Sequence, residues 1–590
     1  MHRPPGQQRV IIHFDYDCFY ASVVENENPA LKSVPLAVQQ KQIVVTCNYE
    51  ARRRGLRKLQ LITEAKKVCP EVVIVLGEDL TRFRDASKDL YNFVQQSIWS
   101  GKAERLGFDE VWLDCTDMVD YNMGLLNLND LSHSFFCMSR DDPTVGFTYD
   151  ASSVYGPTYP SNPPPSVQLS SEDEELRLRL VLGSHLARHL RHELESQKGY
   201  TSTVGIAMNK LLAKLAGNVN KPKNQTTILP PCEPNGSVES NITRFLDDHD
   251  IGKIPGIGFK LAQKIRAHVL GRDAAFAEGL VYGGTKESVT VLDVRSYPGM
   301  GPKLLDDILA GPGSSKGIGG RIWDLINGVD DSEVAKVKRV PSQISQEDSY
   351  MKYLHTFEQV KNQLQILGER LIRRMQIDLL EDADDDGRGA GENPRRRWMA
   401  HPRTLRLSTR PRPLLGPDGA RARTFQRSSR SGPMPNFVFS LNETTSALAQ
   451  RLVEEALVPM FRKLHHEHAS WNLSLINIAA TNMAETAAET KESQGRDIGR
   501  MFRRQDEVLK DFRVTVHPDE AEHTESAIPN SPAAQSPDTV RTGSDIGMPA
   551  ENDWDSEDGE SQPLERCEIC ENAIPAFALA AHQRYHELSN

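Results

Sequence analysis

Two adjacent carboxylates, Asp109 and Glu110, stand in the apolar stretch LGFDEVWLD at residues 106–114, which otherwise has the pattern of a buried strand. Burying one ionised carboxylate without a partner costs on the order of several kcal/mol, and a second like charge beside it raises that cost. A lysine or a metal ion could neutralise the two acids. The stretch therefore indicates a site where acidic side chains carry chemistry.

A third acid stands in VIIHFDYDCFYA, residues 10–21. This apolar run ends in Asp-x-Asp and passes into a helical pattern, so we expect Asp15 at a strand end, where its side chain and the Tyr16 carbonyl can both reach a cation. With Asp109 and Glu110 on a neighbouring strand, the result would be an oxygen-rich site for Mg²⁺. Two such ions about 3.5–4 Å apart can activate a hydroxyl and stabilise a leaving pyrophosphate. Acid pairs also occur on solvated strand ends, so this pattern alone leaves both interpretations open.

The elements that must position these acids form a mixed pattern. Residues 10–114 alternate short apolar runs with helical stretches, which is typical of an α/β or α+β domain. Residues 120–172 resemble an insertion with little core of its own, and residues 235–330 are mostly helical in pattern. The chain has 590 residues, of which 38% are hydrophobic, so it is long enough for about three to five domains.

The net charge of -11 is unevenly distributed. Residues 518–565 carry 13 acids against the single Arg541, whereas residues 388–430 carry 12 arginines against two acids. The acidity therefore belongs to a Pro- and Ser-rich tail that we expect to be disordered, and the body carries a basic patch suited to nucleic acid.

Cysteine use and hydropathy indicate an intracellular chain. No window approaches the roughly 18 apolar residues of a membrane span, and the N-terminal apolar run is too short for a signal peptide, so we expect no membrane partner. Six of the eight cysteines are scattered without metal-binding spacing, which argues against a disulfide framework.

The remaining two cysteines begin a zinc motif near the end of the sequence. The spacing Cys567-x2-Cys570-x11-His582-x3-His586 places two thiolates on a knuckle and two imidazoles one helical turn apart, which suits tetrahedral Zn²⁺. So short a module cannot bury a core of its own, and zinc would supply its folding free energy. A DNA-binding finger is the competing interpretation, although the predicted helix has an apolar face with little basic character.

Five motifs together resemble the Y-family (translesion) DNA polymerases. HFDYDCFYA resembles the first palm motif of that family, NYEARRRG a fingers motif, and GFDEVWLD its second carboxylate motif. TVGIAMNKLLAKLAGNVNKP resembles a palm helix motif, and KIPGIG resembles the thumb hairpin. The motifs stand in family order, and the resemblance that they carry covers about the first 330 residues. The resemblance implies an α+β multidomain, right-hand polymerase in the nucleus, with primer-template DNA and dNTPs as substrates.

The resemblance also implies domain boundaries. They are residues 1–30 and 96–232 for the palm, with the insertion 120–172; 31–95 for the fingers; 233–330 for a thumb with a helix-hairpin-helix; 331–345 for a linker; 346–517 for the little finger with a basic loop at 382–432; 518–565 for the disordered acidic linker; and 566–590 for the zinc finger.

Individual roles follow from the same resemblance. Asp15, Asp109 and Glu110 would be catalytic acids that, with the Tyr16 carbonyl, hold two Mg²⁺ or Mn²⁺ ions. The residues that would bind the nucleotide are Tyr20, as a steric gate against a ribose 2′-hydroxyl, and Tyr49, Arg52 and Lys221, around the triphosphate. A phenol, a guanidinium and an ammonium all suit phosphate oxygens.

Two of the nucleotide-binding roles have a structural alternative. Tyr20 could be a core residue at a strand-to-helix junction, and Arg52 could lie on a solvated helix face. Lys210 and Lys214 stay open as candidates, because lysines on helices are usually solvated. We expect Asp17, the second acid of the DYD sequence, to be structural and to cap the following helix.

Within the family, VQQKQIVVTCNYEAR, the Phe of GFDE and PSQISQEDSY most resemble the iota branch, with the eta branch as the nearest competitor. In that branch, residues matching Gln40, Lys41, Ile43 and Val45 line the template pocket. A bulky lining would favour a syn template purine and Hoogsteen pairing. The alternative is that Ile43 and Val45 simply pack a small sheet.

Two further segments resemble DNA contacts. Gly256 and Gly258 of KIPGIG offer bare backbone amides that can approach a phosphate closely. TLRLSTRPR alternates like a strand whose polar face carries Arg406 and Arg410, which suits tracking of the DNA backbone. A disordered basic loop is the alternative for 412–432.

Two partner motifs complete the sequence prediction. Residues 494–502 have the spacing of a sliding-clamp peptide, although an ordinary amphipathic turn fits them too. The zinc finger resembles ubiquitin-binding fingers, so ubiquitin or a ubiquitinated clamp is the expected partner, even though Arg584 stands where those fingers often carry an acid. A non-catalytic scaffold that reads ubiquitin at stalled forks, and a dedicated deoxycytidyl transferase, are the alternative functions.

Overall fold

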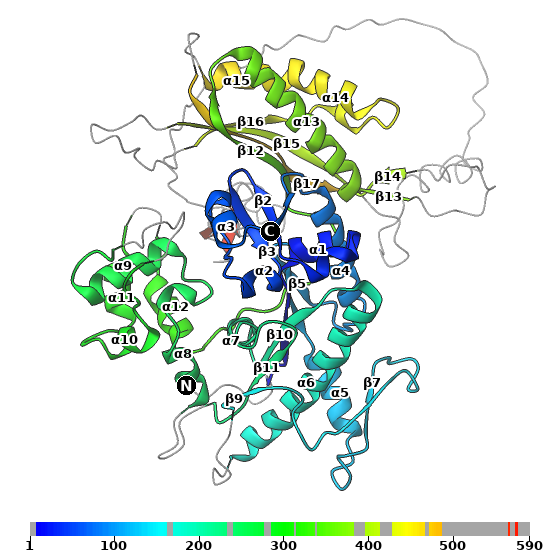
Figure 1. Ribbon diagram of the computed structural model, residues 1–590, viewed down its shortest axis with the longest axis vertical. Helices are drawn as coiled ribbons and strands as arrows, with labels where there is room; N and C mark the ends of the chain where they lie inside the picture. The colour runs from blue at the N-terminus through cyan, green and yellow to red at the C-terminus, as the bar shows by residue number, and fades with distance from the viewer. Residues whose placement is uncertain are drawn as a thin grey trace, which may run out of the picture. The chain divides into compact units, whose positions relative to one another are not determined.

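The computed structural model describes residues 8–161, 169–232, 240–275, 285–311, 314–336, 339–382, 396–412, 427–465 and 471–486, with short strands at 564–566 and 573–575. The chain divides into two compact units, Met1–Val337 with Pro549–Asn590, and Lys338–Met548 (Figure 1). Both contain α-helices and β-strands, so the expected mixed multidomain fold is confirmed. None of the described helices combines the length and apolar character that a bilayer span requires.

A six-stranded sheet forms the centre of the first unit. Its strands, in spatial order, are β5 (Ala103–Leu106), β6 (Glu110–Asp114), β1 (Ile11–Tyr16), β10 (Ser202–Ala207), β11 (Gln225–Ile228) and β9 (Thr158–Tyr159). β1 pairs antiparallel with both β6 and β10, and almost all of its residues are buried. A central strand that is apolar on both faces requires helices on both faces.

Helices supply that cover. They are α1 (Phe19–Glu27), α4 (Thr81–Gln95), α5 (Thr116–Leu125), α6 (Ser171–Lys198) and α7 (Lys210–Ala216). The long α6 begins where the Ser170 side chain accepts a hydrogen bond from the amide of Asp173, and it ends at Gly199 in the left-handed conformation. α6 runs alongside the sheet in Figure 1, and α7 lies beside β10.

The expected insertion carries the hairpin of β7 (Ser134–Cys137) and β8 (Gly146–Tyr149). Its Phe136 and Tyr149 are buried in the core of the main sheet. The described residues of this segment therefore contribute to the core of the main sheet.

A small sheet with its own core follows β1 in the chain. Its strands are β2 (Leu36–Gln40), β3 (Ile43–Cys47) and β4 (Val73–Leu76), and its helices are η1 (Pro29–Ser33), α2 (Tyr49–Arg53) and α3 (Ile62–Val68). α2 begins at Asn48, whose side chain accepts a hydrogen bond from the amide of Ala51.

The last part of the first unit is helical, as its sequence pattern predicts. It contains α8 (Asn241–Asp247), η2 (Ile251–Lys253), α9 (Phe259–Leu270), α10 (Val291–Ser296), α11 (Pro302–Leu309) and α12 (Ile318–Ile326).

The second unit packs helices on one face of a four-stranded sheet. The strands, in spatial order, are β12 (Gln343–Leu354), β17 (Leu473–Glu485), β15 (Ala400–Pro411) and β16 (Ser428–Pro433). The other elements are α13 (Phe357–Leu379), the ribbon of β13 (Leu380–Asp382) and β14 (Arg396–Trp398), η3 (Asn436–Phe439), α14 (Thr445–Leu452), η4 (Val453–Leu457) and α15 (Val458–Leu464).

The expected basic loop over 382–432 contains β14, all of β15 and most of β16. The strand predicted from TLRLSTRPR is confirmed as part of β15, whereas the loop expected over 412–432 is wrong for most of β16. β16 has no apolar alternation, but its backbone pairs with β15, and the Ser429 hydroxyl donates to Ser408 Oγ at 2.8 Å. Backbone pairing at a sheet edge therefore sets this strand, and the loop-like composition misled the sequence interpretation.

Candidate active site

The three predicted acids meet at the ends of two neighbouring strands. In the antiparallel pair of β1 and β6, Asp15 stands directly opposite Glu110. The backbone amide of Tyr16 donates to the carbonyl of Asp109 at 2.8 Å, so Asp109 lies beside the same strand end. The two side chains of the cross-strand pair, Asp15 and Glu110, are 14% and 13% exposed, so solvent screens them poorly.

The stretch LGFDEVWLD is a hairpin, and the expectation of one strand through it is wrong. β5 ends at Leu106, three residues turn, and β6 begins at Glu110. Gly107 has a φ of 68°, which glycine adopts without the steric penalty that a side chain brings. Asp109 therefore stands in the turn and Glu110 on the strand, which brings both toward Asp15.

Two lysines reach the acids from other elements. Lys221 Nζ lies 2.5 Å from Asp15 Oδ2, and Lys214 Nζ on α7 lies 2.8 Å from Glu110 Oε2. His13 Nε2 lies 3.7 Å from the other oxygen of Glu110. Lysines thus supply the neutralising charge that the buried acids require, which was one of the two possibilities open from the sequence.

The acids differ in how readily they ionise. Burial raises the pKa of Asp15 to about 6 against the opposing effect of Lys221, and burial together with the charges of Asp15 and Glu110 raises the pKa of Asp109 to about 7. Burial also acts to raise the pKa of Glu110, but the ammonium group of Lys214 outweighs it through its charge and its hydrogen bond, and that pKa is lowered. Because burial lowers the pKa of His13 to about 3, its ring is neutral near pH 7, and the positive charge beside Glu110 belongs to Lys214.

The donor set fits a hard divalent cation. Three carboxylates and the Tyr16 carbonyl are oxygen donors of the kind that Mg²⁺ and Mn²⁺ prefer. Within the described ranges, no three Asp, Glu, His or Cys side chains are already grouped in ligating geometry. The cationic ends of Lys221 and Lys214 against two of the acids mark positions where a positive charge is stabilised, so the chemistry of the site suits such an ion.

Tyr20 lies on α1 beside this cluster and is half-buried. Its ring stacks on Phe83 at a centroid distance of 4.3 Å and lies 6.1 Å from the ring of Phe108, next to Asp109. One side of the ring is therefore supported by packing, and part of the side chain stays accessible.

Tyr49 and Arg52 lie together on α2. The Arg52 guanidinium carbon is 4.5 Å from the centre of the Tyr49 ring, and Arg52 Nε donates to the carbonyl of Cys47 at 3.2 Å. Burial raises the pKa of Tyr49. The negative charges of Asp17 and of Asp15, which belongs to the acid cluster, raise that pKa further.

Neighbouring charged residues have structural roles. Arg53 on α2 and Arg54, the residue that follows the helix, both pair with Glu50, which fits a solvated helix face. Asp17 is structural as expected, but the expectation that it caps α1 is wrong: its carboxylate accepts from the Thr203 hydroxyl and the Lys223 amide, because the side chain turns toward β10.

The expected template-pocket residues lie on the small sheet. Ile43 and Val45 are half-buried and alternate with Val44, which is in the small core; neither belongs to any of the apolar cores formed by the described residues. Gln40 Nε2 donates to the carbonyl of Gly77, and Lys41 occupies the exposed turn with a φ of 51°.

The two expected DNA-backbone elements lie in different units. Gly256 has a φ of 88°, and a Cβ added to Gly258, at the start of α9, would meet no described atom within 4 Å. On β15, Arg406 and Arg410 are half-buried and point to the face opposite Leu405, which is in the core.

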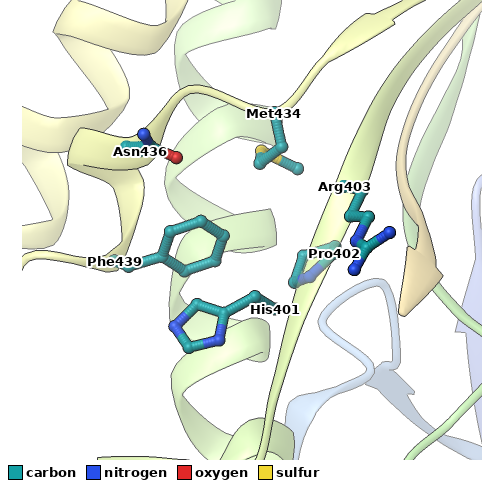
Figure 2. Close-up of a pocket in the computed structure, with 6 residues that line it drawn as sticks. All are labelled: His401, Pro402, Arg403, Met434, Asn436 and Phe439. Atoms are coloured by element: carbon teal, nitrogen blue, oxygen red, sulfur yellow. The ribbon is translucent and has the colours of Figure 1, made fainter. Parts of the chain in front are cut away.

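A shallow hollow of about 460 Å³ in the second unit is the pocket shown in Figure 2. It is lined by His401, Pro402, Arg403, Met434, Asn436 and Phe439. No carboxylate lines it, so it does not offer the oxygen donors that the acid cluster offers.

Several predicted residues lie outside the described part of the chain. They are the zinc ligands Cys567, Cys570, His582 and His586, the segment 494–502, and nearly all of the acidic linker. The described strands β18 (Leu564–Arg566) and β19 (Ala573–Pro575) pair antiparallel and flank the segment that carries both cysteines.

Comparison with known families identifies the chain. The model of the impB/mucB/samB family matches residues 14–218, and the model of that family's C-terminal domain matches residues 341–495. The chain belongs to this family. It is the Y family to which the sequence motifs point, and the first match includes all three acids, Tyr20, Tyr49 and Arg52.

Relatives of this Y-family chain include several named DNA polymerases. DNA polymerase iota of Homo sapiens is 32% identical over 81% of the chain and 53% of its own length. DNA polymerase eta of Drosophila melanogaster is 30% identical over 44% of the chain and 30% of its own length, and DNA polymerase IV of Aeromonas hydrophila is 27% identical over 51% and 72%. The chain spans about half the length of the human and mouse iota relatives.

Two residues beside the acid cluster were missed or undervalued from the sequence. Lys214 is only 18% exposed and contacts Glu110, whereas lysines on helices are usually solvated. His13 was not considered. It stands two residues before Asp15 on β1, so strand alternation alone would have placed it on the same face.

The raised pKa of Asp109 predicts a pH-dependent stability effect. Its folded-state pKa lies well above the ordinary 3.8, so the unfolded chain releases this proton first and stability falls as pH rises from about 4 to about 7. In EDTA, Asp109→Asn should therefore stabilise the first unit at pH 8 by about 2 kcal/mol, and by clearly less at pH 5. Thermal unfolding measures this, with the exposed Asp141→Asn as control. Equal gains at both pH values would contradict the prediction.

Proposed function

We propose that the chain is a template-directed DNA polymerase of the Y family, which extends a primer past damaged template bases with low fidelity. The observation that carries the proposal is the cross-strand pair of Asp15 and Glu110 with Asp109 beside it, inside the match to the family. A non-catalytic scaffold would have no use for three buried, mutually repelling acids.

Nucleotidyl transfer assigns each of these residues a task. Two Mg²⁺ or Mn²⁺ ions held by Asp15, Asp109, Glu110 and the Tyr16 carbonyl would lower the barrier to attack by the primer hydroxyl and stabilise the leaving pyrophosphate. Tyr49, Arg52 and Lys221 would hold the triphosphate; the ring of Tyr49 against the guanidinium fixes the orientation of Arg52 for phosphate. Tyr20, supported by Phe83, would exclude a ribose 2′-hydroxyl.

These roles suggest how the elements correspond to the domains of a right-hand polymerase. The six-stranded sheet would be the palm, the small sheet with α2 the fingers, the helices α8–α12 the thumb, and the four-stranded unit the little finger. Gly256 and Gly258 would contact the DNA backbone through main-chain amides, and Arg406 and Arg410 through the polar face of β15. Because its substrate would be DNA, we propose that the protein acts in the nucleus.

We further propose iota-type base selection. Ile43 and Val45 are half-buried outside the apolar cores of the described residues, so they are available to narrow the space beside a template base. A narrowed pocket favours a syn template purine over an anti one, whereas a template pyrimidine gains nothing from that rotation.

The end of the chain is proposed to be a zinc finger that binds ubiquitin or a ubiquitinated clamp, with 494–502 as a clamp-binding peptide. The pairing of β18 with β19 around the Cys567 and Cys570 segment is the arrangement expected of a zinc knuckle. Zinc content of the full chain with and without Cys567→Ser, and ubiquitin titration of both, test this proposal. Stoichiometric zinc in neither protein would refute it.

Asp109→Ala with Glu110→Ala should abolish primer extension and leave primer-template binding within about threefold, because these acids neutralise metal charge and do not contact DNA. Single-turnover extension and fluorescence anisotropy measure the two effects. The double variant Asp141→Ala with Asp142→Ala, in an exposed loop, is the matched control. A single-turnover extension rate within tenfold of that of the unaltered chain would refute the catalytic proposal.

Tyr20→Ala should admit ribonucleotides, since removal of the ring opens the space that a 2′-hydroxyl would occupy. The ratio of kcat/KM for a dNTP to that for the matching rNTP should fall at least tenfold. Phe83→Leu serves as the control, because it alters the support of Tyr20 and keeps the gate. An unchanged ratio in Tyr20→Ala would show that Tyr20 is only a packing residue.

Incorporation should be far more accurate opposite template A than opposite template T. Steady-state insertion of each single dNTP opposite each of the four bases measures this, and Ile43→Ala should reduce the difference. Equal accuracy opposite all four bases would instead favour an eta-type pocket.

A further inference from the structure

Helix α7 is held against the central sheet by several independent contacts. A Cβ on Gly205 of β10 would lie 1.9 Å from the carbonyl oxygen of Ala213, so only glycine allows this close approach of strand and helix. The indole of Trp112 on β6 donates to the carbonyl of Lys210 at 3.1 Å. Asn209 caps the helix by accepting from the amide of Leu212. The backbone of α7 is therefore fixed relative to β6.

This fixed helix delivers one ammonium group to a proposed metal ligand. Lys214 Nζ lies 2.8 Å from Glu110 Oε2, and it lies 5.5 Å from the centre of the Trp112 ring, which supports it by a cation–π contact. Trp112 stands two residues after Glu110 on the same strand face. Strand and helix thus aim the lysine and the carboxylate at each other.

The Glu110 carboxylate is approached at both of its oxygens. Lys214 lies at Oε2 and the neutral ring of His13 lies 3.7 Å from Oε1. Side chains of both Lys214 and Glu110 are largely buried, so the pair is less screened than a surface ion pair. Because desolvation offsets its Coulomb attraction, a buried pair of this kind adds little net stability.

We propose that Lys214 is a positioning residue that fixes the orientation of the Glu110 carboxylate for the metal ions, through the 2.8 Å contact and the support of Trp112. The proposal rests on the function proposed above and adds a residue to it. Groups that hold a ligating side chain from behind typically change metal affinity by about 10–100-fold when removed.

The sign of the effect separates positioning from simple charge. Removing a cation near three acids should tighten metal binding if Lys214 acts only through its charge. If Lys214 orients Glu110, its removal should weaken metal binding in spite of the lost repulsion.

The test measures Mn²⁺ binding to the full chain on primer-template DNA, without nucleotide, by electron paramagnetic resonance. Lys214→Met should weaken binding about tenfold, and Lys214→Arg should restore it to within about threefold. Lys210→Met is the matched control, because Lys210 lies on the same helix over the same ring but pairs with Glu104, which is not one of the three acids. It should leave Mn²⁺ affinity within twofold.

Unchanged or tighter Mn²⁺ binding in Lys214→Met would overturn the proposal. If that variant does not fold, as judged by its thermal unfolding, Lys214→Leu gives the same discrimination, because it also removes both the charge and the donor that contacts Glu110. A failure of the proposed function would look different: Asp109→Ala with Glu110→Ala would then retain Mn²⁺ binding in the same assay.

Discussion

The register of β1 against β6 is the constraint on which the rest of the site depends. It sets Asp15 directly opposite Glu110, where cross-strand side chains are close neighbours and like charges repel. Burial strengthens that repulsion, since little water is present to screen it. Any structure that keeps these acids must bring positive charge to them, and Lys221 and Lys214 do so from two other segments.

Bringing those charges in determines the surrounding packing. α7 can carry Lys214 to Glu110 only because Gly205 lets the helix lie directly on β10 and Trp112 holds its first turn. The turn at Gly107 places Asp109 beside the same strand end. Each of these features supports an acid cluster whose like charges lower the free energy of unfolding. Functional sites often lower the stability of a fold in this way.

The sequence predicted the acids and their meeting point because the signals are local. An apolar run that ends in Asp-x-Asp marks a strand end, and a pair of acids within a buried pattern requires a neutralising partner nearby. The partners of the acids were harder to foresee. Lys214 looks like any helix lysine until the contact between α7 and β6 is known, since the pairing joins residues 104 positions apart.

Other differences between expectation and structure have similar causes. Gly107 inside an apolar run was not taken as a turn, because the residues around it have strand character. β16 was taken as loop, because Ser, Arg and Gly form a strand there only through pairing with β15. In contrast, the alternation of Arg406 with Leu405 and Leu407 was readable from the sequence, since the two faces of a strand differ by one residue. The zinc, ubiquitin and clamp predictions concern residues outside the described ranges and stay predictions.

The most direct test of the central claim is a crystal structure of the chain with primer-template DNA, a non-hydrolysable dNTP and Mn²⁺, with ions located by anomalous scattering. The account predicts two anomalous peaks between Asp15, Asp109 and Glu110, with Lys221 against the triphosphate and Lys214 still against Glu110. An ordered nucleotide with no anomalous peak at these three carboxylates would contradict it.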